Sequence, residues 1–140
     1  MLSVEASRLF VLIGGCQLIV ALFLAWVMIG KIHFKDSFPF NKVKSYGNLV
    51  KAHIDYLLMS LFLFIFFGVS TLLKVEPHLL PVCLALYGST VNPLGFLIPA
   101  VSPKIAQSSS FSFYRLFLYS GHVATTLGFG WIVLEWMFVI

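Results

Sequence analysis

Long apolar stretches, separated by short polar ones, divide the chain into four parts. The stretches cover residues 9–30, 53–73, 79–101 and 116–140. Each is about as long as the 20 or so residues that a helix needs to cross a hydrocarbon layer of roughly 30 Å. None of the segments between them is long enough to form a separate soluble domain. The pattern therefore predicts a single all-α domain, an integral membrane four-helix bundle in a lipid bilayer.

The composition agrees with this prediction. Hydrophobic residues make up 60% of the chain and charged residues 10%, whereas soluble domains carry roughly 25% charged residues. Cys16 and Cys83 both lie inside predicted spans, where they indicate neither a disulfide framework nor a thiolate metal site. The chain also lacks HExxH, Walker, GxSxG, CxxC and CxxCH motifs, so any haem would be held non-covalently.

Most basic residues lie on one side of the predicted spans. Five lysines fall in residues 31–52, and one lysine and one arginine fall in residues 102–115, whereas the other side carries Arg8 and Lys74. Because basic flanks stay in the cytoplasm, we expect loops 31–52 and 102–115 to be cytoplasmic and both termini to lie outside. Lipid headgroups account for the net charge of +4, so no nucleic-acid partner is expected.

The connection between the first two spans mixes lysines with four aromatic residues, Phe34, Phe38, Phe40 and Tyr46. Aromatic and lysine anchors are typical of a segment at the membrane interface. The alternative is a lid over a site near His53. Only the closeness of the segment to His53 in the sequence supports that alternative.

Five polar residues inside the predicted spans are candidates for function: His53, Asp55, Asn92, His122 and Glu135. An ionisable side chain costs roughly 2.5–3.5 kcal/mol at the centre of a membrane helix, so each should be paired, hydrated or functional. His53 and Asp55 open the second span about 200° apart on the helix, so we expect them to contact different neighbours. His53 is either a helix-end residue or a metal ligand, since imidazole can bind haem iron. His122 is a second candidate ligand.

The later spans carry features of packing and of a cavity. Asn92 either hydrogen-bonds a neighbouring helix or lines a ligand cavity. Pro93 disfavours helical geometry at Asn92, which favours the cavity. Gly121 and Thr125 are spaced like a contact between closely packed helices, and Glu135 should reach water near the end of the last span.

Two segments resemble those of a known family. VKAHIDYLLMS at residues 50–60 resembles the Ala-His segment of the styrene oxide isomerases and, more loosely, the Ser-His-Leu-Glu segment of the hydroxylaminobenzene mutases. Asp55 matches the acidic residue of the mutase segment. TVNPLGFLIPAVSP at residues 90–103 resembles the third-helix segment of the isomerases, in which an Asn precedes a Ser-Pro pair. Both families are small four-helix membrane enzymes.

The resemblance implies a homotrimer in the bacterial inner membrane that holds ferric haem b near its subunit interfaces, with His53 as axial ligand. It also implies an isomerase that converts an epoxide to an aldehyde, with Fe(III) as a Lewis acid on the epoxide oxygen. Cleavage of a carbon–oxygen bond would give a benzylic cation, and a 1,2-hydride shift would complete the product. A dry apolar pocket would keep water from the cation. We therefore expect a small hydrophobic epoxide or a related substrate.

The chain departs from the isomerase pattern at two positions. An Asn six residues after the histidine and a Tyr four residues after the third-helix Asn are replaced by Met59 and Phe96. By resemblance, Asn92 would orient the substrate or its developing oxyanion. Outside the family pattern, Tyr56, on the His53 face of the second span, or Tyr87 could supply the missing hydroxyl. With two polar contacts missing, styrene oxide itself is not the expected substrate.

Two other classes remain open. In a membrane cytochrome for electron transfer or sensing, His53 and either His122 or Met59 would fill both axial positions and leave no room for a substrate. In a non-catalytic membrane subunit, the histidines would be helix-end and packing residues, and there would be no cofactor.

Overall fold

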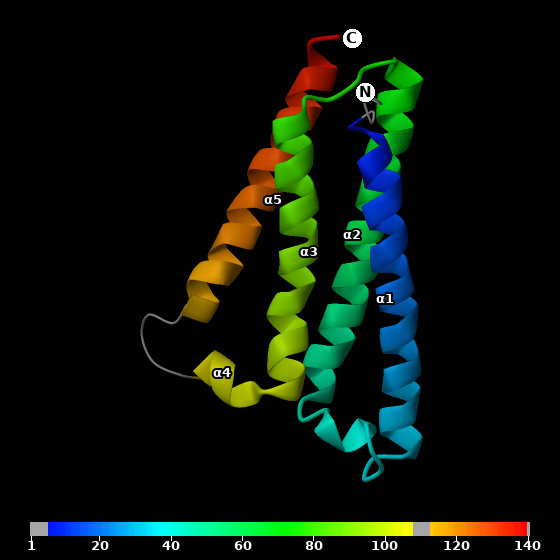
Figure 1. Cartoon of the computed structure of the whole chain (residues 1–140), viewed down its shortest axis with the longest axis vertical. Coiled ribbons are helices and arrows are strands. Elements are labelled where there is room, and N and C mark those ends of the chain that lie inside the picture. The colour runs from blue at the N-terminus through cyan, green and yellow to red at the C-terminus, as the bar shows by residue number, and fades with distance from the viewer. Residues whose placement is uncertain (1–5, 108–112, 140) are drawn as a thin grey trace, which may run out of the picture.

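The computed structural model describes residues 6–107 and 113–139. Its elements in chain order are α1 (Arg8–His33), η1 (Phe40–Lys42), α2 (Tyr46–Leu73), α3 (Leu79–Val101), α4 (Pro103–Gln107) and α5 (Phe113–Met137). The four long helices are each long and apolar enough to cross a membrane. The described residues contain no strand (Figure 1), so the predicted all-α membrane four-helix bundle is confirmed.

The four long helices form two pairs. α1 packs along α2, α3 packs along α5, and contacts between α2 and α3 join the pairs. Figure 1 shows that α1 begins and α5 ends at the same end of the bundle, which we call the terminal end. The opposite end, with η1 and α4, is the loop end. The described parts of the two predicted basic loops, residues 31–52, 102–107 and 113–115, lie at the loop end.

The second helix begins earlier than the sequence predicts. α2 starts at Tyr46 because Ser45 caps it: the Ser45 backbone is extended, and its hydroxyl accepts a hydrogen bond from the Asn48 N–H at 3.4 Å. His53 therefore lies two turns inside α2, about 10 Å from its first residue. The helix thus begins seven residues before the predicted span 53–73.

α3 runs unbroken through Pro93 and Pro99. The expected loss of helical geometry at Asn92 is therefore wrong. A proline leaves the carbonyl four residues earlier without its helical partner. The Gly95 carbonyl, freed in this way by Pro99, accepts a hydrogen bond from the Tyr114 hydroxyl of α5 at 2.6 Å. A side chain of the neighbouring helix thus replaces one missing backbone bond.

Small residues let α3 and α5 approach closely. A Cβ atom added to Gly88 would lie 2.7 Å from the Thr125 Cα, and one added to Gly128 would lie 2.8 Å from the Ala85 Cα. A Cβ atom on Gly121 would lie 2.5 Å from a side chain of α3. The helix contact predicted at Gly121 and Thr125 is therefore confirmed, and it continues to Gly128.

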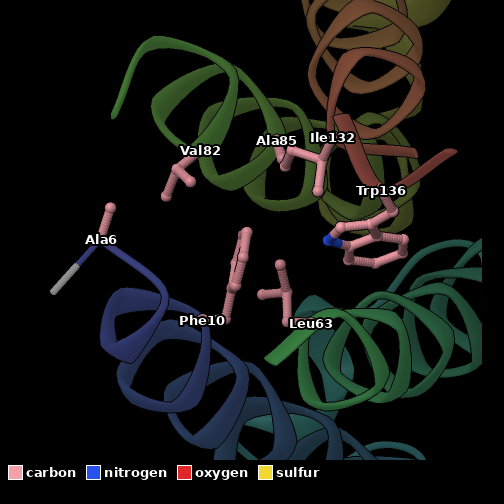
Figure 2. Close-up of a cluster of buried hydrophobic side chains, with 7 residues drawn as sticks. All are labelled: Ala6, Phe10, Leu63, Val82, Ala85, Ile132 and Trp136. Carbon is pink, nitrogen blue, oxygen red and sulfur yellow. The ribbon is translucent and has the colours of Figure 1, made fainter. Parts of the chain in front are cut away.

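Two clusters of buried apolar side chains fill the bundle. The cluster at the terminal end draws on all four long helices (Figure 2): Ala6, Phe10, Leu63, Val82, Ala85, Ile132 and Trp136. The cluster at the loop end draws on α1, α2, α3 and the segment before α2: Ala21, Leu24, Val43, Leu49, Ala52, Tyr56 and Ala100. α5 contributes nothing to the second cluster, so the His53 region is built by the other three helices.

The segment between α1 and α2 is attached to the ends of α1 and α3. The Phe40 ring lies directly on Gly30, where an added Cβ atom would be 2.7 Å from the ring's Cδ1. The N–H groups of Lys44 and Ser45 both donate to the Ala100 carbonyl, at 2.8 and 3.0 Å. None of these contacts involves the imidazole that a lid would cover, so they agree better with the interfacial interpretation.

Candidate functional site

His53 lies on α2 and faces α1. Its Nδ1 is 2.9 Å from the carbonyl oxygen of Ala21, near the middle of α1. A carbonyl oxygen only accepts, so Nδ1 donates its proton and Nε2 keeps a lone pair in the neutral imidazole. Histidines that bind metals commonly donate their other N–H to a carbonyl in this way, which fixes the tautomer and the orientation of the ring. The half-buried His53 is thus arranged as a metal ligand would be.

An apolar groove lies between α1 and α2, one helical turn from His53 toward the terminal end. Its volume is about 330 Å³, and it is lined by Leu18, Leu57, Leu58, Ser60, Leu61 and Phe64. The Ser60 hydroxyl donates to the Gly14 carbonyl at 2.8 Å and is therefore already satisfied. The groove next to His53 offers hydrocarbon walls to a flat apolar molecule.

Tyr56 is the candidate hydroxyl that the structure places near His53. It is 5% exposed and belongs to the same cluster as Ala21, whose carbonyl accepts the His53 bond. Tyr87 lies elsewhere: it is exposed on α3, and its hydroxyl is 2.8 Å from the Ser120 Oγ of α5. Only Tyr56 of the two therefore lies by the α1–α2 interface.

Asn92 lies between α3 and α5, in the other helix pair from His53. Its Nδ2 donates to the Thr125 Oγ1 at 3.0 Å, as packing between helices would require. Its Oδ1 is buried and has no hydrogen-bond partner among the described residues. An unsatisfied buried oxygen costs free energy, so this oxygen remains able to accept a hydrogen bond from a donor outside the described residues.

The two candidate histidines are on different helices and do not face each other: His53 of α2 points to α1, whereas His122 is on α5. His122 is exposed on α5, and its Nδ1 is 3.0 Å from the Leu118 carbonyl of the same helix. Asp55, half-buried on α2, is close enough to His122 to interact with it electrostatically. His53 instead contacts α1, so the prediction that His53 and Asp55 meet different neighbours is confirmed. This arrangement disfavours one iron bound by both histidines of a single chain.

Sequence reasoning missed Gln17, which is 3% exposed. Its Nε2 donates to the Ser89 Oγ at 3.1 Å and to the Thr90 Oγ1 at 3.2 Å, so it joins α1 to α3. A signal was present, because Gln17 lies three residues after Gly14 and four before Ala21, on the small-residue face of the first span.

Two carboxylates at the terminal end have hydrogen-bond partners within the protein. Glu76 accepts hydrogen bonds from the N–H and the hydroxyl of Ser7, both at 2.8 Å, and so caps the start of α1. Glu135 lies near the end of α5 and is 14% exposed, and its Oε1 lies 2.7 Å from the Nδ1 of His78. The two residues meet because the fold brings the start of α3 beside the end of α5.

Among residues 6–107 and 113–139, no three His, Cys, Asp or Glu side chains gather into a group that could hold a metal ion. A haem iron differs, because the macrocycle supplies four ligands and the protein needs to supply only one. Cys16 and Cys83 are free and exposed, in agreement with the expectation of no disulfide framework. Comparison of the chain with protein family models, curated proteins and solved structures gave no match.

Proposed function

We propose that this chain is a membrane haem b protein in which His53 binds the iron, and that it isomerises a small hydrophobic epoxide or a related substrate. The observation that carries the proposal is the contact of His53 Nδ1 with the Ala21 carbonyl, which leaves Nε2 free to bind a metal. The neighbouring groove of about 330 Å³ fits the apolar edge of a macrocycle. The segment at residues 50–60, which resembles the Ala-His segment of the styrene oxide isomerases, points to the same residue.

Ferric haem, when bound, supplies a Lewis acid that can polarise an epoxide oxygen. The residues of the chain would hold the group and exclude water. Ala21 holds the His53 ring in one orientation, and the leucines of the groove keep water from a cationic centre. Tyr56 is the nearest candidate hydroxyl to His53, and it would donate a hydrogen bond to the substrate oxygen.

The same proposal includes a homotrimer in the bacterial inner membrane with its loop end in the cytoplasm. The groove beside His53 lies on the lipid-facing surface of one chain, where Leu58 is 46% and Leu61 is 52% exposed. A second copy would cover the part of a macrocycle that the groove leaves open. The excess of lysine and arginine at the loop end supports the orientation.

The first test is the absorption spectrum of the protein purified in detergent, oxidised and reduced. We expect a Soret band that shifts on addition of imidazole or cyanide, because His53 would be the only protein residue on the iron and an added ligand could still bind. His53→Ala should lose the haem while still inserting and folding. His78→Ala is the matched control, since His78 is 80% exposed at the terminal end, and it should keep the haem.

Each other outcome contradicts a part of the proposal. Stoichiometric haem in His53→Ala would exclude His53 as the ligand. A Soret band that does not respond to added ligands would indicate a six-coordinate cytochrome. A chain that shows no Soret band even after haem supplementation during expression would be a membrane subunit without this cofactor.

A second test separates a substrate role of Asn92 from helix packing. Asn92→Ala should keep the haem and lose turnover of small aryl epoxides to aldehydes, measured by gas chromatography. Thr125→Val is the control, because it removes the hydrogen bond between Asn92 and Thr125 but leaves the unpartnered Oδ1 in place. Equal losses of turnover in the two variants would show that Asn92 acts only through packing.

A further inference from the structure

The arginine and the lysine of the terminal end lie against one cavity. Arg8 opens α1 and Lys74 follows the last residue of α2, so they are distant in the sequence. The cavity between them has a volume of about 310 Å³, and its lining also includes Phe67, Thr71, Val75 and Glu76. The fold thus gathers both of these positive charges at one point on the boundary of the bundle.

Lys74 caps α2 through its backbone, and this cap does not require a lysine side chain. Its φ of 55° lies in the left-handed region that favours glycine. Its N–H donates to the Ser70 and Thr71 carbonyls and so caps α2. A glycine would form the same cap with less strain. The lysine side chain therefore adds something that the cap does not require, a positive charge at the cavity.

The remaining walls combine a polar rim with an apolar surface. Phe67 and Val75 are partly buried against the core cluster of the terminal end. Glu76 accepts two hydrogen bonds from Ser7, which hold its carboxylate at the start of α1. Arg8 and Lys74 contribute the basic side chains of the same lining.

We propose that this cavity binds the phosphate group of one phospholipid, with Arg8 and Lys74 on the phosphate and the first part of an acyl chain on Phe67 and Val75. Guanidinium and ammonium groups both bind phosphate oxygens, and basic pockets between membrane helices take up lipid headgroups. The apolar wall and the position at the ends of two spans favour a phospholipid over free phosphate. The site is independent of the proposed haem site, which lies toward the loop end.

The test uses the full chain reconstituted with phosphatidylglycerol, extracted into a mild detergent, and weighed by native mass spectrometry. The wild type should retain one lipid per chain. Arg8→Gln together with Lys74→Gln should lower its occupancy about 25-fold, since each cation near a lipid surface contributes a factor of about five. The control, Lys35→Gln together with Lys104→Gln at the loop end, should retain lipid as the wild type does.

Lys74→Gly separates the cavity from the helix cap. It should lose lipid as Lys74→Gln does and yet unfold at a higher temperature than Lys74→Gln, because glycine relieves the left-handed strain. Diacylglycerol, which lacks the phosphate, should not be retained. Equal lipid retention by the wild type and the double glutamine variant would overturn the proposal. Protection from thermal unfolding by inorganic phosphate, without any lipid retained, would overturn it in favour of an ion site.

Discussion

Uncharged polar side chains make several of the links between the helices of this bundle. Gln17 bonds α1 to α3, Asn92 bonds α3 to α5, and Ser60 bonds α2 to α1. The hydrocarbon core offers no water to such groups, so each must find its partner within the protein. The amides of Gln17 and Asn92 each use their N–H groups and keep a buried, unpartnered oxygen within the described part of the chain. The donor half of each amide thus holds two helices together, while the acceptor half remains available.

Gln17→Leu should therefore cost little. Hydrogen bonds between membrane helices contribute about 0.6 kcal/mol on average, and the substitution also removes the unpartnered oxygen. We expect the free energy of unfolding to fall by less than about 1 kcal/mol, measured by circular dichroism during titration with sodium dodecyl sulfate. Gln17→Ala should cost more, because it also leaves a void. A larger loss in Gln17→Leu than in Gln17→Ala would contradict this account.

Glycines determine how closely the helices α3 and α5 pack against each other. Gly88, Gly121 and Gly128 face the neighbouring helix so closely that a methyl group would overlap it, whereas Gly130 has nothing within 4 Å of an added Cβ atom. In a membrane such close approach is a main source of helix association, since lipid is as apolar as the helices themselves. The close packing of α3 against α5 thus depends on glycine, which has no side chain, at these three positions.

Gly128→Ala and Gly130→Ala form a matched pair for this contact. The first should lower the free energy of unfolding by about 1–3 kcal/mol, because the obstructing atoms belong to the backbone of α3 and cannot move aside. The second should leave stability unchanged or raise it by up to about 1 kcal/mol, since alanine is the better helix former. Equal effects of the two substitutions in the same denaturation assay would show that the helices do not pack as described.

Helix bounds can be predicted from the sequence where hydropathy changes sharply at the end of a helix, and less well where the end of the helix is polar. Hydropathy predicts 79–101 as the third span, and α3 has these bounds. Hydropathy misses the first two turns of α2, which are partly polar, although Ser45 carries a capping signal. Hydropathy averaged over the first span also gives no sign of Gln17, because its neighbours in the sequence are apolar. The His53 contact has no sequence signal on the acceptor side, because any residue at position 21 would present a carbonyl.

For the whole molecule, the distribution of charge predicts the orientation of the bundle in the membrane. The loop end carries seven lysine and arginine residues, five in residues 31–52 and two in residues 102–115, whereas the terminal end carries Arg8 and Lys74. Since positively charged flanks resist translocation, the loop end should face the cytoplasm. The bundle places the starts of α1 and α3 and the end of α5 on the opposite side.

Cysteine labelling tests this orientation in a background with Cys16→Ala and Cys83→Ala. Asp36→Cys lies in the exposed segment at the loop end, and His78→Cys replaces an exposed side chain at the terminal end. A membrane-impermeant maleimide added to intact cells should modify His78→Cys and should reach Asp36→Cys only after lysis. The reverse pattern would place the loop end outside the cell.

Because the bundle consists of two helix pairs, we expect that the pairs can be expressed as two separate polypeptides. Residues 74–78 are the only covalent connection between the α1–α2 pair and the α3–α5 pair. Each helix forms its backbone hydrogen bonds mainly within itself, and membrane helices can insert before they associate. A gene interrupted between Val75 and Glu76 should therefore yield two fragments that meet in the membrane, so that variants of one half can be screened by complementation against a constant other half.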